Sequence, residues 1–238
     1  MRRFATEDDI FKIRDKIVKV YLKKILRRFK RLNQGMVVGF DEINVLSAVN
    51  TTYEDVINMS MDALKKIAKQ TYRWVCDDDF PIEMWMAETT GMSRAEAIDY
   101  VLSRTIDPWV AEFLQLYDPV THYKWYDEAD RKRSRAYEAI MSCRTAAERK
   151  KQIEVALKAW AKQFEQTADN VVEAVLKKAY EGNGIKYVKW VTKMDKRVCS
   201  DCHKRNGKIY PITSPDLHPL HYNCRCWWIP IRKNVSKK

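Results

Sequence analysis

The sequence has few of the residues that end helices. Its 238 residues include six glycines and seven prolines, and four of the prolines lie after residue 210. So few turn-forming residues are typical of long helices, because glycine and proline are the residues that disfavour helix interiors most. The hydrophobic content of 46% is ample for a buried core. We therefore expect a mainly α protein.

Long apolar runs are also absent. No stretch approaches the roughly 18 apolar residues that would span a bilayer. The opening MRRFATEDDIF is basic at first, but acidic residues interrupt it before the apolar region of a secretory signal develops. We expect a protein made in a cytoplasm, with no membrane partner. Because thiols stay reduced there, its clustered cysteines favour metal binding over disulfides.

Charge is distributed unevenly along the chain. Residues 1–33 carry twelve Lys and Arg against four Asp and Glu, and residues 182–238 carry thirteen against three. Residues 34–181 are acidic, with 19 basic and 25 acidic side chains. Basic ends gain free energy on a polyanion such as nucleic acid by releasing its counterions, although solubility alone is another interpretation. The candidate DNA contacts are Lys23, Lys24, Arg27, Arg28, Lys30 and Arg31.

Apolar periodicity predicts the first helices. Apolar residues recur every three or four positions over 6–33, which predicts a helix with a basic outer face. The stretch NQGMVVGF predicts its end, and Asp41 is a candidate cap for the next helix. A further helical segment is expected after Ser60, ending at Cys76.

Two capping boxes predict later helix starts. They are Ser93 with Glu96 and Thr145 with Glu148, in which the hydroxyl and the carboxylate bind the first amides of a helix. The second box opens the longest helical pattern, which the stretch EGNG ends. Further helices are expected over residues 107–116 and 127–143. Apolar residues in the intervening loops predict a docking surface that includes Trp85 and Trp125, with packing inside the body as the alternative.

The pattern changes after Gly184. The stretches IKYVKWVTK, GKIYPI and WWIPI are short, β-branched and aromatic, which is typical of strands. We therefore predict a helical body over 1–181, with its basic helix at 6–33, and a small α+β module over 182–238.

Four of the six cysteines and three of the four histidines lie between Val198 and Ile231. Cys199-x2-Cys202 and His221-x2-Cys224 are two ligand pairs of the kind that hold Zn²⁺ in closed tetrahedral sites. The alternative fourth ligand is Cys226, and His218 and His203 are weaker candidates. We predict a structural zinc ion that stabilises the module, because the module has too few carboxylates for a catalytic base. The alternatives are a cluster of reduced thiols packed as small hydrophobes, or cysteines that form disulfides only after release into an oxidising medium.

The C-terminal sequence resembles the phage head morphogenesis proteins, the minor head proteins of the Mu F-like group. The resemblance covers residues of about 170–230 and rests on GIKYVKWVTKMDKRVCSDCHKRNGKIY followed by HYNCRC. The matching positions are Trp190, Thr192, Asp195, Cys199, Cys202, Gly207, Lys208, His221, Cys224, Arg225 and Cys226. Tyr222 stands where the family usually has proline.

The resemblance implies a structural virion component of the phage head rather than an enzyme. Such a protein would associate with the portal or the major capsid protein, near the packaged double-stranded DNA, and would have no small-molecule substrate. Two other hypotheses stay open. HPLHYNC suggests a zinc-containing nuclease of the His-Asn-His type, and the charge suggests a zinc-ribbon-like DNA-binding protein.

Overall fold

The computed structural model describes residues 7–38, 41–76, 91–116, 124–182, 184–192, 198–214, 217 and 226–231. Its elements are α1 (Glu7–Val38), α2 (Glu42–Cys76), α3 (Arg94–Phe113), α4 (Trp125–Met141), α5 (Ala146–Gly182), β1 (Tyr187–Thr192), α6 (Ser200–Arg205), β2 (Ile209–Pro211) and β3 (Cys226–Ile231). The expected mainly α fold with a small C-terminal sheet is confirmed.

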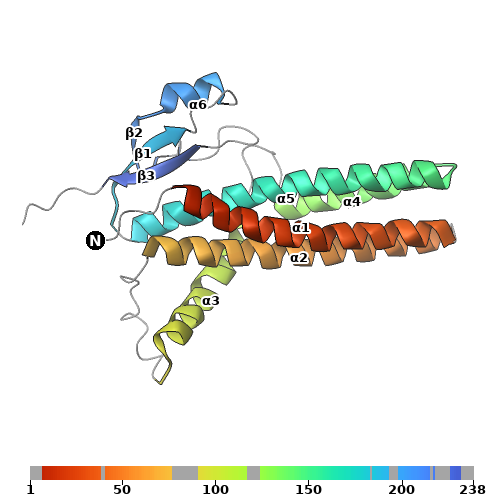
Figure 1. Cartoon of the computed structure of the whole chain (residues 1–238), viewed down its shortest axis with the longest axis horizontal. Helices are drawn as coiled ribbons and strands as arrows, with labels where there is room; N and C mark the ends of the chain where they lie inside the picture. Colours follow the sequence, from red (N-terminus) through yellow and green to blue (C-terminus); the bar gives the residue numbers. More distant parts are fainter. Residues whose placement is uncertain are drawn as a thin grey trace, which may run out of the picture.

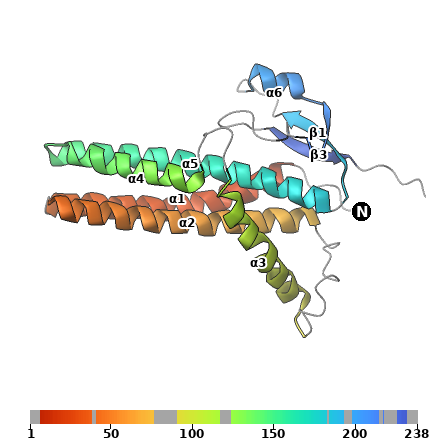
Figure 2. The same ribbon diagram turned by 180° about the vertical axis from the view of Figure 1, so that it is seen from behind.

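Four long helices form an extended bundle. Helices α1, α2, α4 and α5 lie side by side, and α3 diverges from the bundle (Figures 1 and 2). The sheet and α6 lie near the C-terminal end of α5 (Figure 1). No helix in the described part of the chain has the length and apolar character needed to span a membrane.

An aromatic cluster joins the four bundle helices. Phe29 of α1 meets Tyr53 of α2 edge to face at 5.8 Å between ring centroids, and Tyr53 meets Trp160 of α5 at 5.5 Å. Trp125 of α4 completes the cluster at 6.2 Å from Trp160. Trp160 is 1% exposed, and its indole N–H donates to the Ser60 hydroxyl at 3.3 Å.

Trp125 is therefore a core residue. Its side chain is 6% exposed, so the prediction that it contributes to a docking surface is wrong. The residue begins α4, and its ring turns inward, where it meets Trp160 of α5. Trp85 lies outside the described residues.

Helix α1 is longer than the predicted 6–33. It continues through Gly35 to Val38, because Met36 extends the buried stripe of Phe29 and Leu32 by another turn. Gly35 is exposed, and its cost in a helix is about 1 kcal/mol. Asp41 is confirmed as the cap of α2, since its carboxylate accepts from the Ile43 amide at 3.2 Å.

Two predicted breaks are also wrong. Helix α2 is continuous through Ser60, whose hydroxyl donates to the Val56 carbonyl at 2.7 Å. Helix α3 runs from Arg94 through Pro108 to Phe113, so residues 107–116 do not form a separate helix. Pro108 is exposed, whereas Ile106 and Val110 on either side are fully buried and hold the helix in place.

Both capping boxes are confirmed. The Ser93 amide donates to the Glu96 carboxylate at 2.8 Å, and the Glu96 amide donates to the Ser93 hydroxyl at 3.3 Å. In the second box, the Thr145 amide donates to the Glu148 carboxylate at 3.0 Å, and the Glu148 amide donates to the Thr145 hydroxyl at 3.2 Å. These hydrogen bonds lower the pKa values of both glutamates. The largest effect on Glu96 comes from the Ser93 side chain, and the largest effect on Glu148 comes from the Thr145 backbone amide.

Helix α5 ends in a glycine cap that turns the chain into the sheet. Gly184 has a φ of +69°, and the Ile185 amide donates to the Tyr180 carbonyl at 3.0 Å. This is the pattern of a left-handed glycine cap. The Tyr180 hydroxyl also donates to the Trp228 carbonyl at 3.4 Å, which links α5 to β3. The division of the chain into two domains near residue 182 stays a prediction.

The C-terminal sheet is antiparallel, in the order β2-β1-β3. Val188, Trp190 and Trp228 form its buried face, each at most 3% exposed. Helix α6 covers this face, with the Arg205 guanidinium 5.4 Å from the centroid of the Trp190 ring.

Candidate functional site

The first cysteine pair forms a compact turn at the start of α6. Cys199 is the N-cap of this helix, and its sulfur accepts from the Cys202 amide at 3.3 Å. The His203 amide donates to the Cys199 carbonyl at 3.0 Å. The thiolate is the form in which a cysteine binds a metal.

Cys226 lies at the start of β3, beside the end of β1. Cys226 pairs with Thr192 at the end of β1. The Thr192 amide donates to the side-chain oxygen of Asn206, which follows α6, at 3.0 Å. Thr192 is therefore the common neighbour of β3 on one side and of the C-terminal end of α6 on the other. Cys202 and Cys226 are 2% and 4% exposed, respectively.

The described part of the predicted zinc site contains Cys199, Cys202 and Cys226 as thiols. His221, Cys224 and His218 lie outside the described residues, and His203 is exposed on α6. Among the residues that the structure describes, no three Cys, His, Asp or Glu side chains gather as a metal-binding group. Sulfur donors fit Zn²⁺ by their chemistry, and the complete ligand set stays a prediction.

The six candidate DNA contacts do not share one face of α1. Lys23, Arg27, Lys30 and Arg31 are exposed. Arg28 instead forms an ion pair with Asp55 of α2 at 3.2 Å. The Lys24 ammonium lies 4.6 Å from the centroid of the Tyr21 ring. Arg28 therefore contacts a second bundle helix, whereas Lys24 is exposed and contacts a ring of its own helix.

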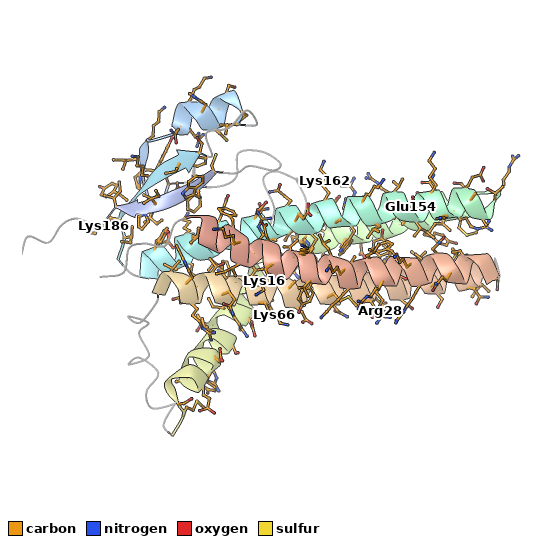
Figure 3. All side chains as sticks on the ribbon, in the orientation of Figure 1. Lys16, Arg28, Lys66, Glu154, Lys162 and Lys186 are labelled. Carbon is orange, nitrogen blue, oxygen red and sulfur yellow. The ribbon has the colours of Figure 1, made fainter. Side chains whose placement is uncertain are left out.

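The helical phase of α1 defines a continuous basic surface, which we call the basic stripe: Lys16, Lys19, Lys23, Arg27 and Lys30. The spacings of three and four residues place these exposed side chains on the outer side of α1, opposite the buried Tyr21 and Ile25. Figure 3 shows Lys16 on this helix. Among the described residues, none of the five has an ion pair. The six DNA contacts predicted from the sequence do not include Lys16 and Lys19, although the spacing of these two lysines already placed them on the same side of the helix.

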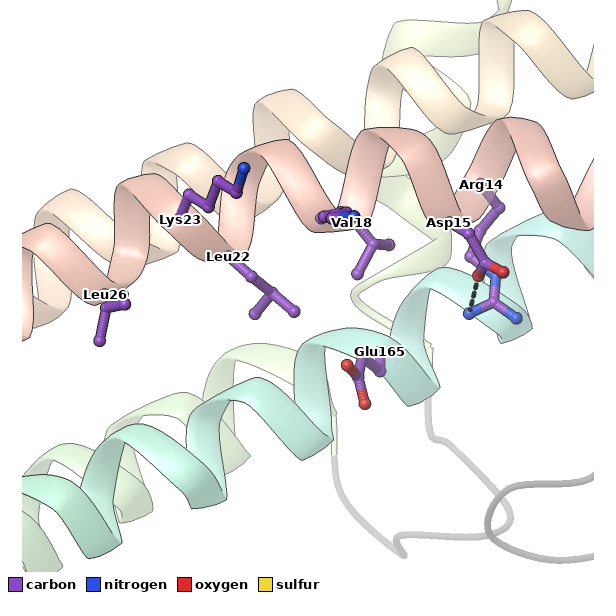
Figure 4. Close-up of a pocket in the computed structure, with 8 residues that line it drawn as sticks. Arg14, Asp15, Val18, Leu22, Lys23, Leu26 and Glu165 are labelled. Atoms are coloured by element: carbon purple, nitrogen blue, oxygen red, sulfur yellow. Dashed lines mark ion pairs between the residues drawn. The ribbon is translucent and has the colours of Figure 1, made fainter.

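A groove of about 440 Å³ lies beside the stripe, between α1 and α5 (Figure 4). Val18, Leu22 and Leu26 line it from α1, and Glu165 lines it from α5. At one end, Arg14 forms ion pairs with Asp15 at 2.9 Å and with Asp169 of α5 at 2.7 Å. Charges of both signs line the groove, so its electrostatics do not favour one class of ligand.

Comparison with known proteins connects this site to a family. The model of a family described as Phage Mu protein F like protein matches residues 132–229. This part of the chain is similar to that family. The Mu F-like region includes most of α4, all of α5 and nearly all of the sheet, and it contains the cysteine turn. The resemblance seen in the sequence is confirmed, and the family supports a phage head-related protein. No curated protein and no solved structure matches the chain significantly.

Proposed function

We propose that the protein is a minor head protein, a structural component of the phage head that associates with the portal or the inner capsid wall and with packaged DNA. The match of residues 132–229 to the Mu F-like family carries this proposal. The protein would be made in the host cytoplasm and incorporated during head assembly. It would act by binding rather than by catalysis and would need no small-molecule substrate.

The basic stripe supports contact with double-stranded DNA. The first and last of its five cations are 14 residue steps apart on α1, which is about 21 Å of helix axis at 1.5 Å per residue. Such a row neutralises phosphates without reading base edges, so binding would be indifferent to sequence and sensitive to salt.

We also propose that the Mu F-like module holds one structural Zn²⁺. Cys199 and Cys202 would supply two ligands, and His221 with Cys224 would supply the others, with Cys226 as the alternative fourth. A bound ion would tie the α6 turn to the end of the sheet and supply folding free energy to a small module. The compact Cys199–Cys202 turn supports this assignment.

The direct experiment compares heads made with and without the gene for this protein. Quantitative mass spectrometry of purified heads should find the protein in the wild-type particles, and proximity cross-linking should join it to portal or major capsid protein. Absence from purified heads would refute the proposal. Metal-dependent cleavage of plasmid DNA would instead favour the His-Asn-His nuclease, and a footprint on one DNA sequence would favour the zinc-ribbon-like regulator.

A further inference from the structure

The C-terminal sheet is covered on one face and open on the other. Val188 and Trp190 point to the face under α6, whereas Tyr187, Ile209 and Ile229 are 45%, 60% and 43% exposed. These three apolar side chains therefore leave much of their surface in contact with solvent. An open apolar sheet face commonly packs against a second layer, and exposed apolar patches mark interaction sites.

The strand register places these side chains in ordered rows. Lys189 of β1 lies opposite Ile209 of β2 and Ile229 of β3. Tyr187 likewise lies between Pro211 and Ile231. Directly opposed residues of antiparallel strands share a face, so the rows form one surface, which we call the open sheet face. A third pair, Val191 with Trp227, extends it.

The dimensions of the open sheet face suit one helix. Three strands cover about 10 Å across, and the four residue steps from Tyr187 to Val191 cover about 13 Å. A single α-helix is about 10–12 Å in diameter with its side chains. The face is therefore wide enough for two turns of one helix, but much smaller than the roughly 800 Å² per partner of a standard interface between globular proteins.

Charge indicates what kind of helix fits. Lys189 is exposed in the middle of the apolar rows, and Lys186 and Lys208 flank the strands; Figure 3 shows Lys186 beside the sheet. Residues 184–192, 206–214 and 226–231 contain no Asp or Glu. Packing two copies face to face would oppose one Lys189 to another, which is unfavourable. Duplex DNA offers no apolar surface for Ile209 and Ile229.

We infer that the open sheet face binds an amphipathic helix of another head protein, whose apolar stripe covers Ile209 and Ile229 and whose carboxylate pairs with Lys189. This inference rests on the proposed incorporation of the protein into heads. The helix would complete a second layer on the sheet, opposite α6. Its binding energy would come mainly from burial of the isoleucines and Tyr187, and Lys189 would select an acidic partner.

The test uses full-length protein supplied to heads that lack it. Ile209→Asp and Lys189→Glu should each lower the number of incorporated copies about tenfold or more, the loss expected for a residue at the centre of an interface. The matched controls are Ile43→Asp, at a 77% exposed isoleucine of α2, and Lys158→Glu, at an exposed lysine of α5. Both controls should incorporate as the wild type does, and circular dichroism should show that all four variants are folded.

A photo-cross-linking amino acid in place of Ile209 identifies the partner. Cross-links to a helical segment of another head protein that contains Asp or Glu support the inference. Cross-links to DNA overturn it, as do cross-links to a second copy of this chain, whose residues 77–90 combine five carboxylates with apolar residues. Normal incorporation of Ile209→Asp and Lys189→Glu also overturns it. If the wild-type protein itself is absent from heads, the proposed function is refuted. This result is distinct from normal incorporation of the variants, which refutes only the role of the open sheet face.

Discussion

Neutralising part of the basic stripe should change how DNA binding depends on salt. The perturbation is the triple variant Lys16→Gln, Lys23→Gln and Arg27→Gln, at three exposed positions that have no ion pair among the described residues. Glutamine removes the charge and has nearly the same helix propensity as lysine and arginine. The bundle core, which lies on the opposite side of α1, should therefore stay intact.

The magnitude follows from the number of phosphates neutralised. Each contributes a slope of roughly −0.9 to the plot of log affinity against log salt. Five contacts give a slope of about −4.5 for the wild type, and the two that remain in the variant give about −1.8. Between about 50 and 200 mM salt, affinity should then fall by roughly 500-fold in the wild type and by roughly 12-fold in the variant.

Fluorescence anisotropy with a labelled duplex of random sequence measures both slopes. The control variant carries Lys150→Gln, Lys151→Gln and Lys158→Gln, which remove the same charge from exposed positions of α5. Its slope should match that of the wild type if the stripe is the contact. If both triple variants reduced the slope equally, overall charge rather than the basic stripe would govern binding. If the stripe variant had the wild-type slope, the basic stripe would not be the DNA contact.

Three further changes test the core, the metal and the caps. Trp160→Ala should lower the free energy of unfolding by about 3–5 kcal/mol in urea titrations, because it leaves a cavity at the centre of the bundle. A loss below about 1 kcal/mol is the size expected for a surface change and would contradict this packing. Cys202→Ser should abolish zinc in elemental analysis and loosen the module with little loss of helical signal, whereas the control Cys143→Ser should retain zinc. Because capping hydrogen bonds lower the pKa values of Glu96 and Glu148, their stabilisation is present above the ordinary value of 4.5 and is lost as pH falls through the lowered values. Urea midpoints should therefore fall in acid less steeply for the double Gln variant than for the wild type, and identical pH profiles would contradict it.

The sequence predicts much of the fold because its local signals agree with the packing. The spacing of three and four that runs through Trp160, Phe164 and Ala168 corresponds to buried positions of α5. The Ser93 and Thr145 boxes mark helix starts because the hydrogen bonds that define them are local in the chain. The three extended stretches likewise become strands, since their β-branched and aromatic residues suit a half-buried sheet.

The errors arise where distant contacts outweigh a local preference. A glycine costs a helix about 1 kcal/mol, but burying one side chain such as Met36 gains about 1.5–3 kcal/mol, so α1 continues past Gly35. The inward position of Trp125 depends on Trp160, which lies 35 residues later in the chain. Periodicity also cannot show that Arg28 is paired, because its partner Asp55 lies on another helix.

The two proposed surfaces should respond differently to salt. The basic stripe consists of separated cations in water, so its attraction to DNA is screened within about 8 Å at physiological ionic strength. The open sheet face relies on burial of Ile209, Ile229 and Tyr187, and burial of apolar surface is not weakened by simple screening. Washing disrupted heads with rising salt should therefore release DNA from the protein before it releases the protein from its partner. Release of both at the same salt concentration would mean that charge also dominates the sheet face, and Lys189 rather than the isoleucines would then determine docking.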